Sequence, residues 1–221
     1  MILDFLFCKL HYITQLHGVI HVGAHYGEEY GNYKIAGIKD ILFFEPSASS
    51  FSILKNRMDQ QHDDINVICV PIALGSTQTQ ATLHTETANQ GQSSSLLVPK
   101  LHLEAHPTIQ FTGTEQVNVN TLDTIMQYPQ LAATKYNILV MDTQGYELEV
   151  LKGAIEYLAN IDYVYTEVNF AELYEGCAQI DQLDEFLSNH GFKRVQMVKA
   201  TDTWGDAFYV RETLLKKPIE N

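Results

Sequence analysis

Two short apolar segments, residues 18–22 and 41–45, place the strongest constraint on the fold of this chain. The first is followed by a glycine-rich turn at residues 23–27 (GAHYG), where bare backbone amides can approach a polar ligand closely. The second ends in Glu45, 22 positions after Gly23, where a carboxylate can accept hydrogen bonds from ribose hydroxyls. Two strands that end in this way predict a nucleotide-binding half-site.

The spacing of the glycines indicates which class of nucleotide fits. A dinucleotide fingerprint, G-x-G-x-x-G, packs its glycines closely enough for a pyrophosphate to lie on the helix N-terminus. Here Gly23 and Gly27 are more widely spaced, which favours a ligand without a pyrophosphate, such as S-adenosylmethionine. A plain tight turn that binds nothing is the alternative, because glycine is common after a strand.

Strand and helix patterns alternate from Gly18 onward, which is typical of an α/β sheet covered by helices on both faces. Strands are expected at 18–22, 41–45, 66–71, 137–142, 161–168, 192–199 and 206–210, and helices at 28–36, 47–59, 123–128, 146–157 and 179–189. Because no helix separates the last two strands, they should form an antiparallel hairpin at one edge of the sheet. A length of 221 residues suits one domain with a substantial core.

Residues 76–116 interrupt this alternation with a long polar stretch. Alternating patterns at 80–84 and 116–120 suggest two extra strands that flank it. A long insertion in a compact domain is usually functional or disordered. We therefore expect a role in substrate recognition, with a solvated loop as the alternative.

The first 17 residues carry apolar side chains at helical spacing, namely Leu3, Leu6, Phe7, Leu10 and Ile13. This spacing predicts an N-terminal amphipathic helix that packs on the domain. The apolar run is far shorter than the ~20 residues of a membrane-spanning helix. A peripheral membrane anchor is the alternative, which the lack of a basic polar face disfavours. Residues 212–221 are expected to form a C-terminal tail.

The charge balance limits the partners of the chain. There are 14 basic and 27 acidic residues, a formal net charge of -13, and no Lys/Arg cluster, which argues against nucleic acid as a partner. A neutral or cationic small molecule fits better. The three cysteines, Cys8, Cys69 and Cys177, lack the spacing of a disulfide framework or a zinc knuckle, so we expect reduced thiols in a cytoplasmic protein. The oligomeric state is left open, with a homodimer as one option.

Several short motifs accompany the strands in a fixed order. They are His21-Val-Gly-Ala-His25-x-Gly27, Phe44-Glu45-Pro46, Ala73-Leu74-Gly75, Val119-Asn-Thr-Leu-Asp123, Asp142-x-Gln144-Gly145-x-Glu147, Val150-Leu151-Lys152-Gly153, Glu167-Val168-Asn169 and Leu173-Tyr174. With these motifs the sequence resembles the FkbM family of S-adenosylmethionine-dependent methyltransferases from roughly Gly18 to Arg211. It departs from the family at His21 and His25, where Asp and Asn are common, so the contacts that those residues make to the methionine end of the cofactor do not carry over directly.

The resemblance implies a class I methyltransferase, with a Rossmann-like fold in residues 18–211. Its sheet would be mostly parallel and seven-stranded, with one antiparallel edge strand and helices on both faces. The implied reaction is O-methylation, with S-adenosylmethionine as cofactor and a hydroxyl of a sugar, glycan or polyketide-like metabolite as acceptor. The implied place of residues 76–116 is over the active site. Two other readings stay open: a non-catalytic S-adenosylmethionine-binding protein and a nicotinamide-dependent oxidoreductase.

Ligands bind beyond the carboxyl ends of strands in parallel sheets, and this rule gives the predicted site. The expected cofactor neighbours are His21, Gly23, Ala24, His25, Gly27, Glu45, Pro46, Ala73, Leu74 and Asp142, and the expected substrate contacts are His84, Asn89, Ser94 and Ser95. Asp142, Gln144 and Glu167 are expected to carry the chemistry. One of the two carboxylates would act as a general base on a hydroxyl, or both would hold a divalent cation. Glu147 completes the turn or simply favours the helix N-terminus.

His102 and His106 stand four positions apart and would share one face of a helix, which is a geometry that zinc can use. No third ligand is evident in the sequence. A substrate contact, a proton shuttle and a solvated surface pair are the other interpretations of these two histidines.

Overall fold

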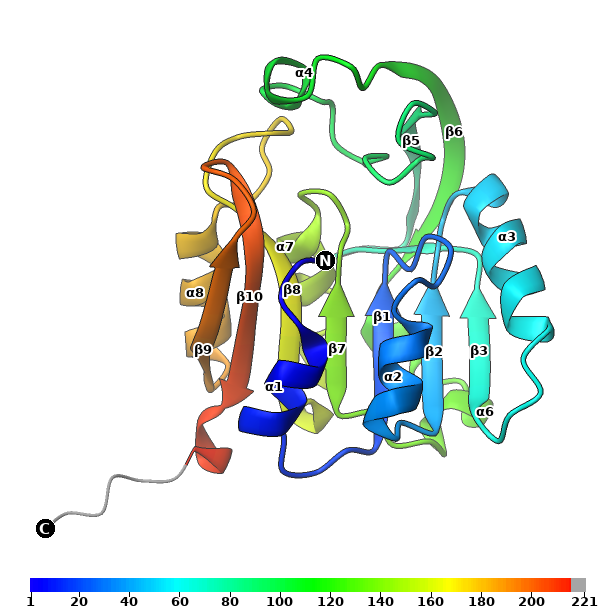
Figure 1. Cartoon of the computed structure of the whole chain (residues 1–221), viewed down its shortest axis with the longest axis vertical. Helices are drawn as coiled ribbons and strands as arrows, with labels where there is room; N and C mark the ends of the chain where they lie inside the picture. Colours follow the sequence, from blue (N-terminus) through cyan, green and yellow to red (C-terminus); the bar gives the residue numbers. More distant parts are fainter. Residues whose placement is uncertain (216–221) are drawn as a thin grey trace, which may run out of the picture.

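The computed structural model describes residues 1–215 of the chain and centres on one seven-stranded sheet (Figure 1). The strands follow the order β3-β2-β1-β7-β8-β10-β9. Their bounds are β1 (Gly18–Val22), β2 (Asp40–Phe44), β3 (Asn66–Val70), β7 (Ile138–Met141), β8 (Tyr163–Asn169), β9 (Phe192–Lys199) and β10 (Trp204–Arg211). All neighbours pair in parallel except β10, which is antiparallel to both β8 and β9. The predicted sheet and its terminal hairpin are therefore confirmed.

The central strands are buried on both faces, which explains their unbroken apolar sequences. In β1, Val19 pairs with Ile41 of β2 and Ile138 of β7, and these three side chains belong to one core. The next residue, Ile20, belongs to a second core on the opposite face of the sheet. Successive side chains of a strand point to opposite faces, so the sheet separates two apolar layers.

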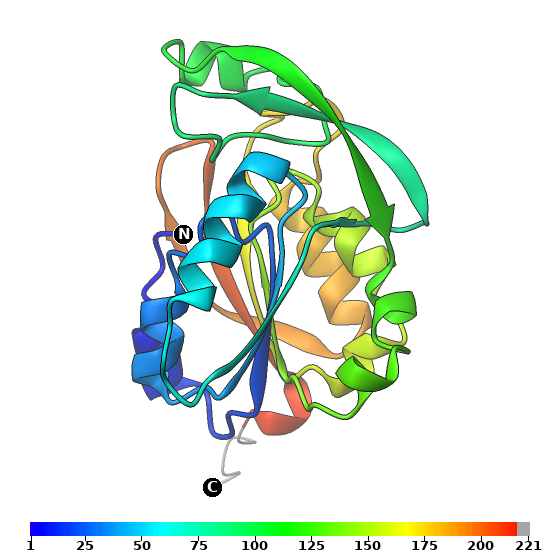
Figure 2. The same cartoon turned by 90° about the vertical axis from the view of Figure 1, so that its right-hand side faces the viewer.

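Helices cover both faces of the sheet (Figure 2). One face carries α1 (Phe5–His11), α2 (Tyr30–Ala36) and α3 (Ala48–Asp59), and the other carries α5 (Leu122–Ile125), α6 (Pro129–Ala132), α7 (Glu147–Lys152) and α8 (Ile180–Asn189). The helix predicted at 146–157 is wrong in its second half, because α7 ends at Lys152 and only a 3-10 turn, η1 (Tyr157–Asn160), follows. At the next residue, Gly153, a Cβ would lie 2.0 Å from the carbonyl oxygen of Gly75, so the chain is packed against another backbone there.

The N-terminal helix is shorter than predicted and buries a different set of side chains. Leu3, Phe5 and Cys8 are buried, whereas Leu10 is 79% exposed and Phe7 is 38% exposed. The predicted apolar stripe was therefore wrong for Phe7 and Leu10. No helix within residues 1–215 is long and apolar enough to cross a membrane. Of the predicted C-terminal tail, Glu212–Leu214 form the 3-10 turn η2, and residues 216–221 lie outside the described part.

Residues 76–116 form a cap above the carboxyl ends of β1, β7 and β8 (Figure 1). The cap contains β5 (Thr79–Glu86), α4 (His102–Ala105) and most of β6 (Phe111–Asn120), and β6 also pairs with the short β4 (Ala73–Leu74). The two extra strands predicted in this region are present as the antiparallel pair β5 and β6, and both are longer than expected.

Candidate active site

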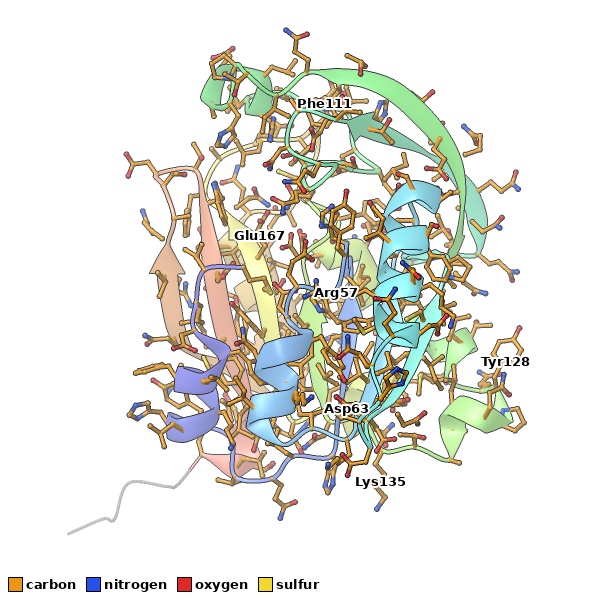
Figure 3. The ribbon with its side chains drawn as sticks, turned by 45° about the vertical axis from the view of Figure 1, so that its right-hand side comes forward. Arg57, Asp63, Phe111, Tyr128, Lys135 and Glu167 are labelled. Carbon is orange, nitrogen blue, oxygen red and sulfur yellow. The ribbon has the colours of Figure 1, made fainter. Side chains whose placement is uncertain are left out.

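A cavity of about 480 Å³ lies between the cap and the carboxyl ends of the parallel strands. Strand β1 is flanked by β2 on one side and by β7 on the other, so the chain crosses from one half of the sheet to the other here. Ligands of open α/β sheets bind at this kind of switch point. Figure 3 shows Glu167 at the end of β8 and Phe111 in the cap above it. The sheet order thus places a cavity where the sequence predicted a ligand.

The turn after β1 requires a glycine at position 23. Gly23 has a φ of +77°, and a Cβ on it would lie 1.9 Å from the carbonyl oxygen of Asp142. The N–H groups of Gly23 and Ala24 both donate to the carbonyl oxygen of Phe44, over 2.9 and 3.0 Å. A residue with a side chain at position 23 would push the end of β1 away from the end of β7. Because Gly23 has no side chain, its backbone lines the floor of the cavity.

Glu45 follows β2 and turns its carboxyl group into the same cavity. One carboxylate oxygen accepts a hydrogen bond from the N–H of His25 over 2.8 Å, and the other accepts from the N–H of Ser47 over 2.9 Å. The residue is only 7% exposed, and burial raises the pKa of Glu45 to about 7, although these two hydrogen bonds oppose the shift. The carboxyl group is held rigidly and is poised to change its charge near neutral pH.

The His25 ring ties the glycine-rich turn to the cap. Its Nε2 lies 2.9 Å from the carbonyl oxygen of Gln90, and its Nδ1 lies 2.8 Å from a carboxylate oxygen of Glu28. A carbonyl can only accept, so Nε2 carries a proton. Burial by itself lowers the pKa of His25, but the bonds to Glu28 and Gln90 outweigh it and leave the pKa raised. Both ring nitrogens are thus engaged within the protein, and His25 serves the site through its backbone N–H.

His21 is buried beneath the same turn. Its Nδ1 lies 3.0 Å from the hydroxyl oxygen of Tyr33, and burial lowers the pKa of His21 to about 4. The imidazole is therefore neutral at physiological pH and adds no positive charge to the cavity.

Asp142 and Glu167 end the neighbouring strands β7 and β8, and the amide of Gln144 links them. Gln144 Nε2 donates to Asp142 over 2.8 Å and to Glu167 over 3.2 Å. The hydroxyl oxygen of Tyr174 lies 2.9 Å from Gln144 Oε1 and 2.9 Å from the carbonyl oxygen of Ser93, so its one proton has two possible acceptors. The predicted proximity of the two acidic side chains is what the structure shows.

Glu167 is 6% exposed. Burial, and then the negative charges of Asp142, Glu147 and Asp206, raise the pKa of Glu167 well above its ordinary value of 4.5. Both effects favour the protonated form of Glu167.

Glu147 is fully buried and holds the turn that carries Gln144. One of its carboxylate oxygens accepts from the N–H and the hydroxyl of Thr143, both over 2.9 Å, and from the N–H of Gly145 over 3.2 Å. Burial raises the pKa of Glu147 as well. Of the two roles considered from the sequence, completion of the turn fits these contacts.

Most of the predicted site residues line the cavity. These are His21, Gly23, Ala24, His25, Glu45, Pro46, Ala73, Leu74, Asn89, Ser94, Ser95, Asp142, Gln144 and Glu167. Two do not. Gly27 faces the core, where a Cβ would meet Leu54 at 2.8 Å. His84 alternates with Leu83 along β5, and Leu83 is the one that lines the cavity.

The sequence interpretation missed several residues that line the cavity. Among them are Glu28 and Glu29 from the segment before α2 and Trp204 from the start of β10. Trp204 is the single tryptophan of the chain, which was the only signal available for it. Met1 also lines the cavity, and its α-amino nitrogen lies 3.8 Å from a carboxylate oxygen of Asp142 and 3.9 Å from one of Glu29.

His102 and His106 do share a face of α4, with ring centroids 4.8 Å apart, and both line the cavity. Burial lowers the pKa of His102 to about 4, and its Nδ1 is buried without a hydrogen-bond partner. Within residues 1–215, no group of three His, Cys, Asp or Glu side chains is arranged to hold a metal ion. The pair therefore has no third ligand in the described structure.

Comparisons with known proteins agree with this arrangement. The fold is similar to magnesium protoporphyrin IX methyltransferase (ChlM) from Synechocystis PCC 6803 with bound SAH, with a TM-score of 0.51 and 9% identity, over 93% of this chain and 79% of that one. It is also similar to a protein of the NADB-Rossmann superfamily from Streptococcus agalactiae, with a TM-score of 0.52 and 10% identity, over 93% and 67% of the two chains. At these identities the likeness concerns the fold alone.

The sequence comparisons are more specific. The 2-O-methyltransferase NoeI of Sinorhizobium fredii (strain NBRC 101917 / NGR234) is 34% identical over 84 residues, which are 38% of this chain. The match spans about a third, 34%, of the length of that relative. The methyltransferase FkbM domain matches residues 21–194, which is most of the chain. The protein therefore belongs to the FkbM methyltransferase family.

Proposed function

We propose that this protein transfers a methyl group from S-adenosylmethionine to a hydroxyl oxygen of a sugar, glycan or polyketide-like acceptor. The observation that carries the proposal is that one cavity holds Glu45 and the Gly23 turn together with the cluster of Asp142, Gln144 and Glu167. The name of the relative from Sinorhizobium fredii, a 2-O-methyltransferase, supports oxygen as the methylated atom.

The cofactor side of the cavity has the donors and acceptors that an adenosyl group needs. Each carboxylate oxygen of Glu45 accepts one backbone N–H and keeps a lone pair for a ribose hydroxyl. Gly23 exposes backbone at the floor of the cavity, where a side chain has no room. Ala73 and Leu74 line the cavity and are buried, which suits contact with an adenine ring. These residues would hold the cofactor without any phosphate-binding group.

The acceptor side of the cavity supplies a base. S-adenosylmethionine, when bound, supplies a methyl group on a positively charged sulfur, and the protein must align an acceptor hydroxyl in line with it. We assign Asp142 as the group that takes the hydroxyl proton as the new carbon–oxygen bond forms. The raised pKa of Glu167 favours its protonated form, which can donate a hydrogen bond to the acceptor. Gln144 is a positioning residue, since its amide bonds to both carboxyl groups.

The proposal does not include a divalent cation. The oxygens of Asp142 and Glu167 that face each other are already bridged by an N–H donor, and a cation would have to displace the Gln144 amide. The two other readings of the sequence, a non-catalytic binding protein and a nicotinamide-dependent oxidoreductase, gain no support from these contacts. The cytoplasmic location stays a prediction.

Calorimetric titration with S-adenosylhomocysteine tests the cofactor site. We expect micromolar binding to the unchanged protein, a large loss of affinity in Glu45→Ala, and no competition by NAD. Because a buried carboxyl is removed, thermal unfolding of Glu45→Ala must first show that the variant is folded. Absence of S-adenosylhomocysteine binding to the unchanged protein, or tighter binding of NAD, would refute the proposal.

A further inference from the structure

We infer that the acceptor is a neutral glycoside, with no phosphate or carboxylate of its own, and that its sugar ring stacks on Trp204. The inference rests on the proposed methyl transfer and narrows its acceptor. Two independent features of the cavity lead to it, namely the sign of the charges that line it and an aromatic side chain in the same lining.

The cavity is lined by carboxyl groups from five residues, which are Glu28, Glu29, Glu45, Asp142 and Glu167. Within residues 1–215, no lysine or arginine lines it. The α-amino group of Met1 does line the cavity, but it already lies within 4 Å of Asp142 and Glu29. Phosphate sites in proteins are built from cationic side chains or free backbone N–H groups. The raised pKa of Glu167 favours its neutral form, so the negative charge of the lining comes from the other carboxyl groups. An anionic acceptor would approach these groups and find no lysine or arginine among residues 1–215 of the lining to pair with.

Three of the four histidines that line the cavity do not reverse this balance. Burial lowers the pKa of both His21 and His102 to about 4, so both rings are neutral at physiological pH. The ring of His25 is paired with the carboxylate of Glu28 and with the carbonyl of Gln90. A phosphorylated sugar thus has no counter-charge among these three groups, whereas a neutral polyol needs none.

Trp204 supplies the surface for the sugar ring. It is the first residue of β10 and pairs with Asn169 of β8, and Asp206 pairs with Glu167 in the same register. Residues two apart on a strand share a face, so Trp204 lies on the same face of the sheet as Glu167. The indole is partly exposed and lines the cavity. The indole also packs against the cluster of Leu173, Tyr174 and Cys177. Its flat apolar ring lines the same cavity as Asp142 and Glu167, and it matches a sugar, which has an apolar face of C–H groups and a rim of hydroxyls.

Other parts of the cavity lining are also suited to a neutral ligand. His102, His106, Ile109 and Leu173 line the cavity. His102 and His106 contribute imidazole rings, and Ile109 and Leu173 contribute apolar groups. The polar partners for the hydroxyls of the acceptor come from Asp142, Gln144 and Glu167. A pocket that is mostly apolar with a few convergent polar groups is typical of small-molecule sites.

The charge of the cavity lining also indicates at which stage the sugar is methylated. A sugar that is still attached to a nucleoside diphosphate carries two phosphate charges close to its ring. Such a molecule is unsuited to this cavity, so the sugar must lose its carrier before it is methylated. The reaction that supplies the acceptor is therefore a glycosyl transfer, and methylation acts on its product.

The test uses matched pairs of acceptors with the full-length protein. Methyl glycosides of common hexoses and 6-deoxyhexoses would be compared with the corresponding sugar 1-phosphates and nucleoside diphosphate sugars. Binding is measured by saturation-transfer NMR with S-adenosylhomocysteine present, and methyl transfer is measured with S-adenosylmethionine. We expect at least about a tenfold higher kcat/KM for the neutral member of a pair. Equal or better use of the phosphorylated member would overturn the inference.

Two substitutions at Trp204 separate stacking from packing. Trp204→Phe keeps an aromatic face, whereas Trp204→Leu keeps an apolar side chain without one. We expect KM for the glycoside to rise by about tenfold in Trp204→Leu and much less in Trp204→Phe. The affinity for S-adenosylhomocysteine and the melting temperature should be similar in both variants.

The outcomes also distinguish this inference from the proposed function. If S-adenosylhomocysteine binds but no neutral glycoside does, or if the Leu and Phe variants behave alike, the acceptor inference is wrong while the cofactor site stands. If S-adenosylhomocysteine itself does not bind, the proposed function has failed.

Discussion

The substitution Glu45→Gln removes the charge of the proposed ribose ligand and should change how both stability and cofactor binding depend on pH. In the folded protein, burial raises the pKa of Glu45 to about 7 from an ordinary value of 4.5. Glutamine fills nearly the same volume and still offers one oxygen to the backbone donors of His25 and Ser47. Its NH2 group faces the second donor, so a uniform cost of about 1–3 kcal/mol is expected from that mismatch.

The pH-dependent part has a definite sign and size. Between pH 4.5 and 7 the folded protein holds a proton on Glu45 that the unfolded chain releases, so the stability supplied by Glu45 is greatest below pH 4.5. It is lost as the pH rises through about 7. The difference between the two pKa values corresponds to about 3 kcal/mol. This contribution to the pH dependence disappears in Glu45→Gln.

Binding of the cofactor should show the opposite dependence. Ribose hydroxyls donate hydrogen bonds to the ionised carboxylate, so binding favours ionisation and releases a proton. With a pKa near 7, the ionised fraction of Glu45 rises from roughly a tenth at pH 6 to roughly nine tenths at pH 8, and affinity should rise about tenfold. The variant should bind more weakly and with little dependence on pH.

The measurement is calorimetric titration with S-adenosylhomocysteine at pH 6, 7 and 8, in two buffers of different ionisation enthalpy. The difference between the buffers counts the protons released. Urea unfolding at the same pH values gives the stability of each protein. The partly buried Glu29 and the buried Asp206 also have raised pKa values, so the comparison is the difference between the unchanged protein and the variant at each pH. An affinity that stays flat with no proton release, or a variant with an unchanged stability slope, would refute the reasoning.

Three further substitutions test other parts of the site. Gly23→Ala places a Cβ 1.9 Å from the carbonyl oxygen of Asp142 at a φ of +77°, so we expect a loss of at least about 1–3 kcal/mol of stability, seen as a lower Tm, and loss of S-adenosylhomocysteine binding. Asp142→Asn should lower kcat by about 10²- to 10⁴-fold and leave S-adenosylhomocysteine affinity nearly unchanged, and normal turnover would exclude Asp142 as the base. His25→Phe removes the bonds to Glu28 and Gln90, so hydrogen exchange in residues 87–95 should become faster; unchanged exchange there would show that the ring does not hold the cap.

The sheet was predictable because burial on both faces leaves a clear signature in the sequence. Val19 and Ile20 lie in different cores, so a strand that is buried on both faces is apolar at consecutive positions rather than at alternate ones. The hairpin of β9 and β10 was predictable because the chain between them is too short for a helix. The buried face of α1 was not. Phe5 is buried and Leu10 is exposed, and both are apolar, so helical spacing alone cannot say which of them faces the domain.

The candidate site also contains residues that were predictable from the sequence and residues that were not. Gly23, Glu45 and Asp142 follow directly from the ends of strands, and a parallel sheet brings such ends together at one edge. Trp204 comes from a hairpin and lines the cavity, and Gln90 comes from a loop in the cap and contacts His25. Both approaches depend on tertiary packing that no local pattern records. The role of His25 was also hidden. Its ring is held by Glu28 and Gln90, and the group that it offers to Glu45 is a backbone N–H, which any residue could supply.

The assignment of the base depends on a difference that the sequence does not contain. Asp142 and Glu167 are both acidic residues at the ends of adjacent strands, and their positions in the pattern are equivalent. The structure makes them unequal, because 24% of the Asp142 side chain is exposed whereas Glu167 is buried among three other acidic groups, which raise its pKa. The side chain of Gln144 lies between the two carboxyl groups and contacts both of them. In the proposed reaction, Glu167, whose pKa is raised, is the donor and Asp142 is the base, so the depth of burial is the difference on which we assign the two roles.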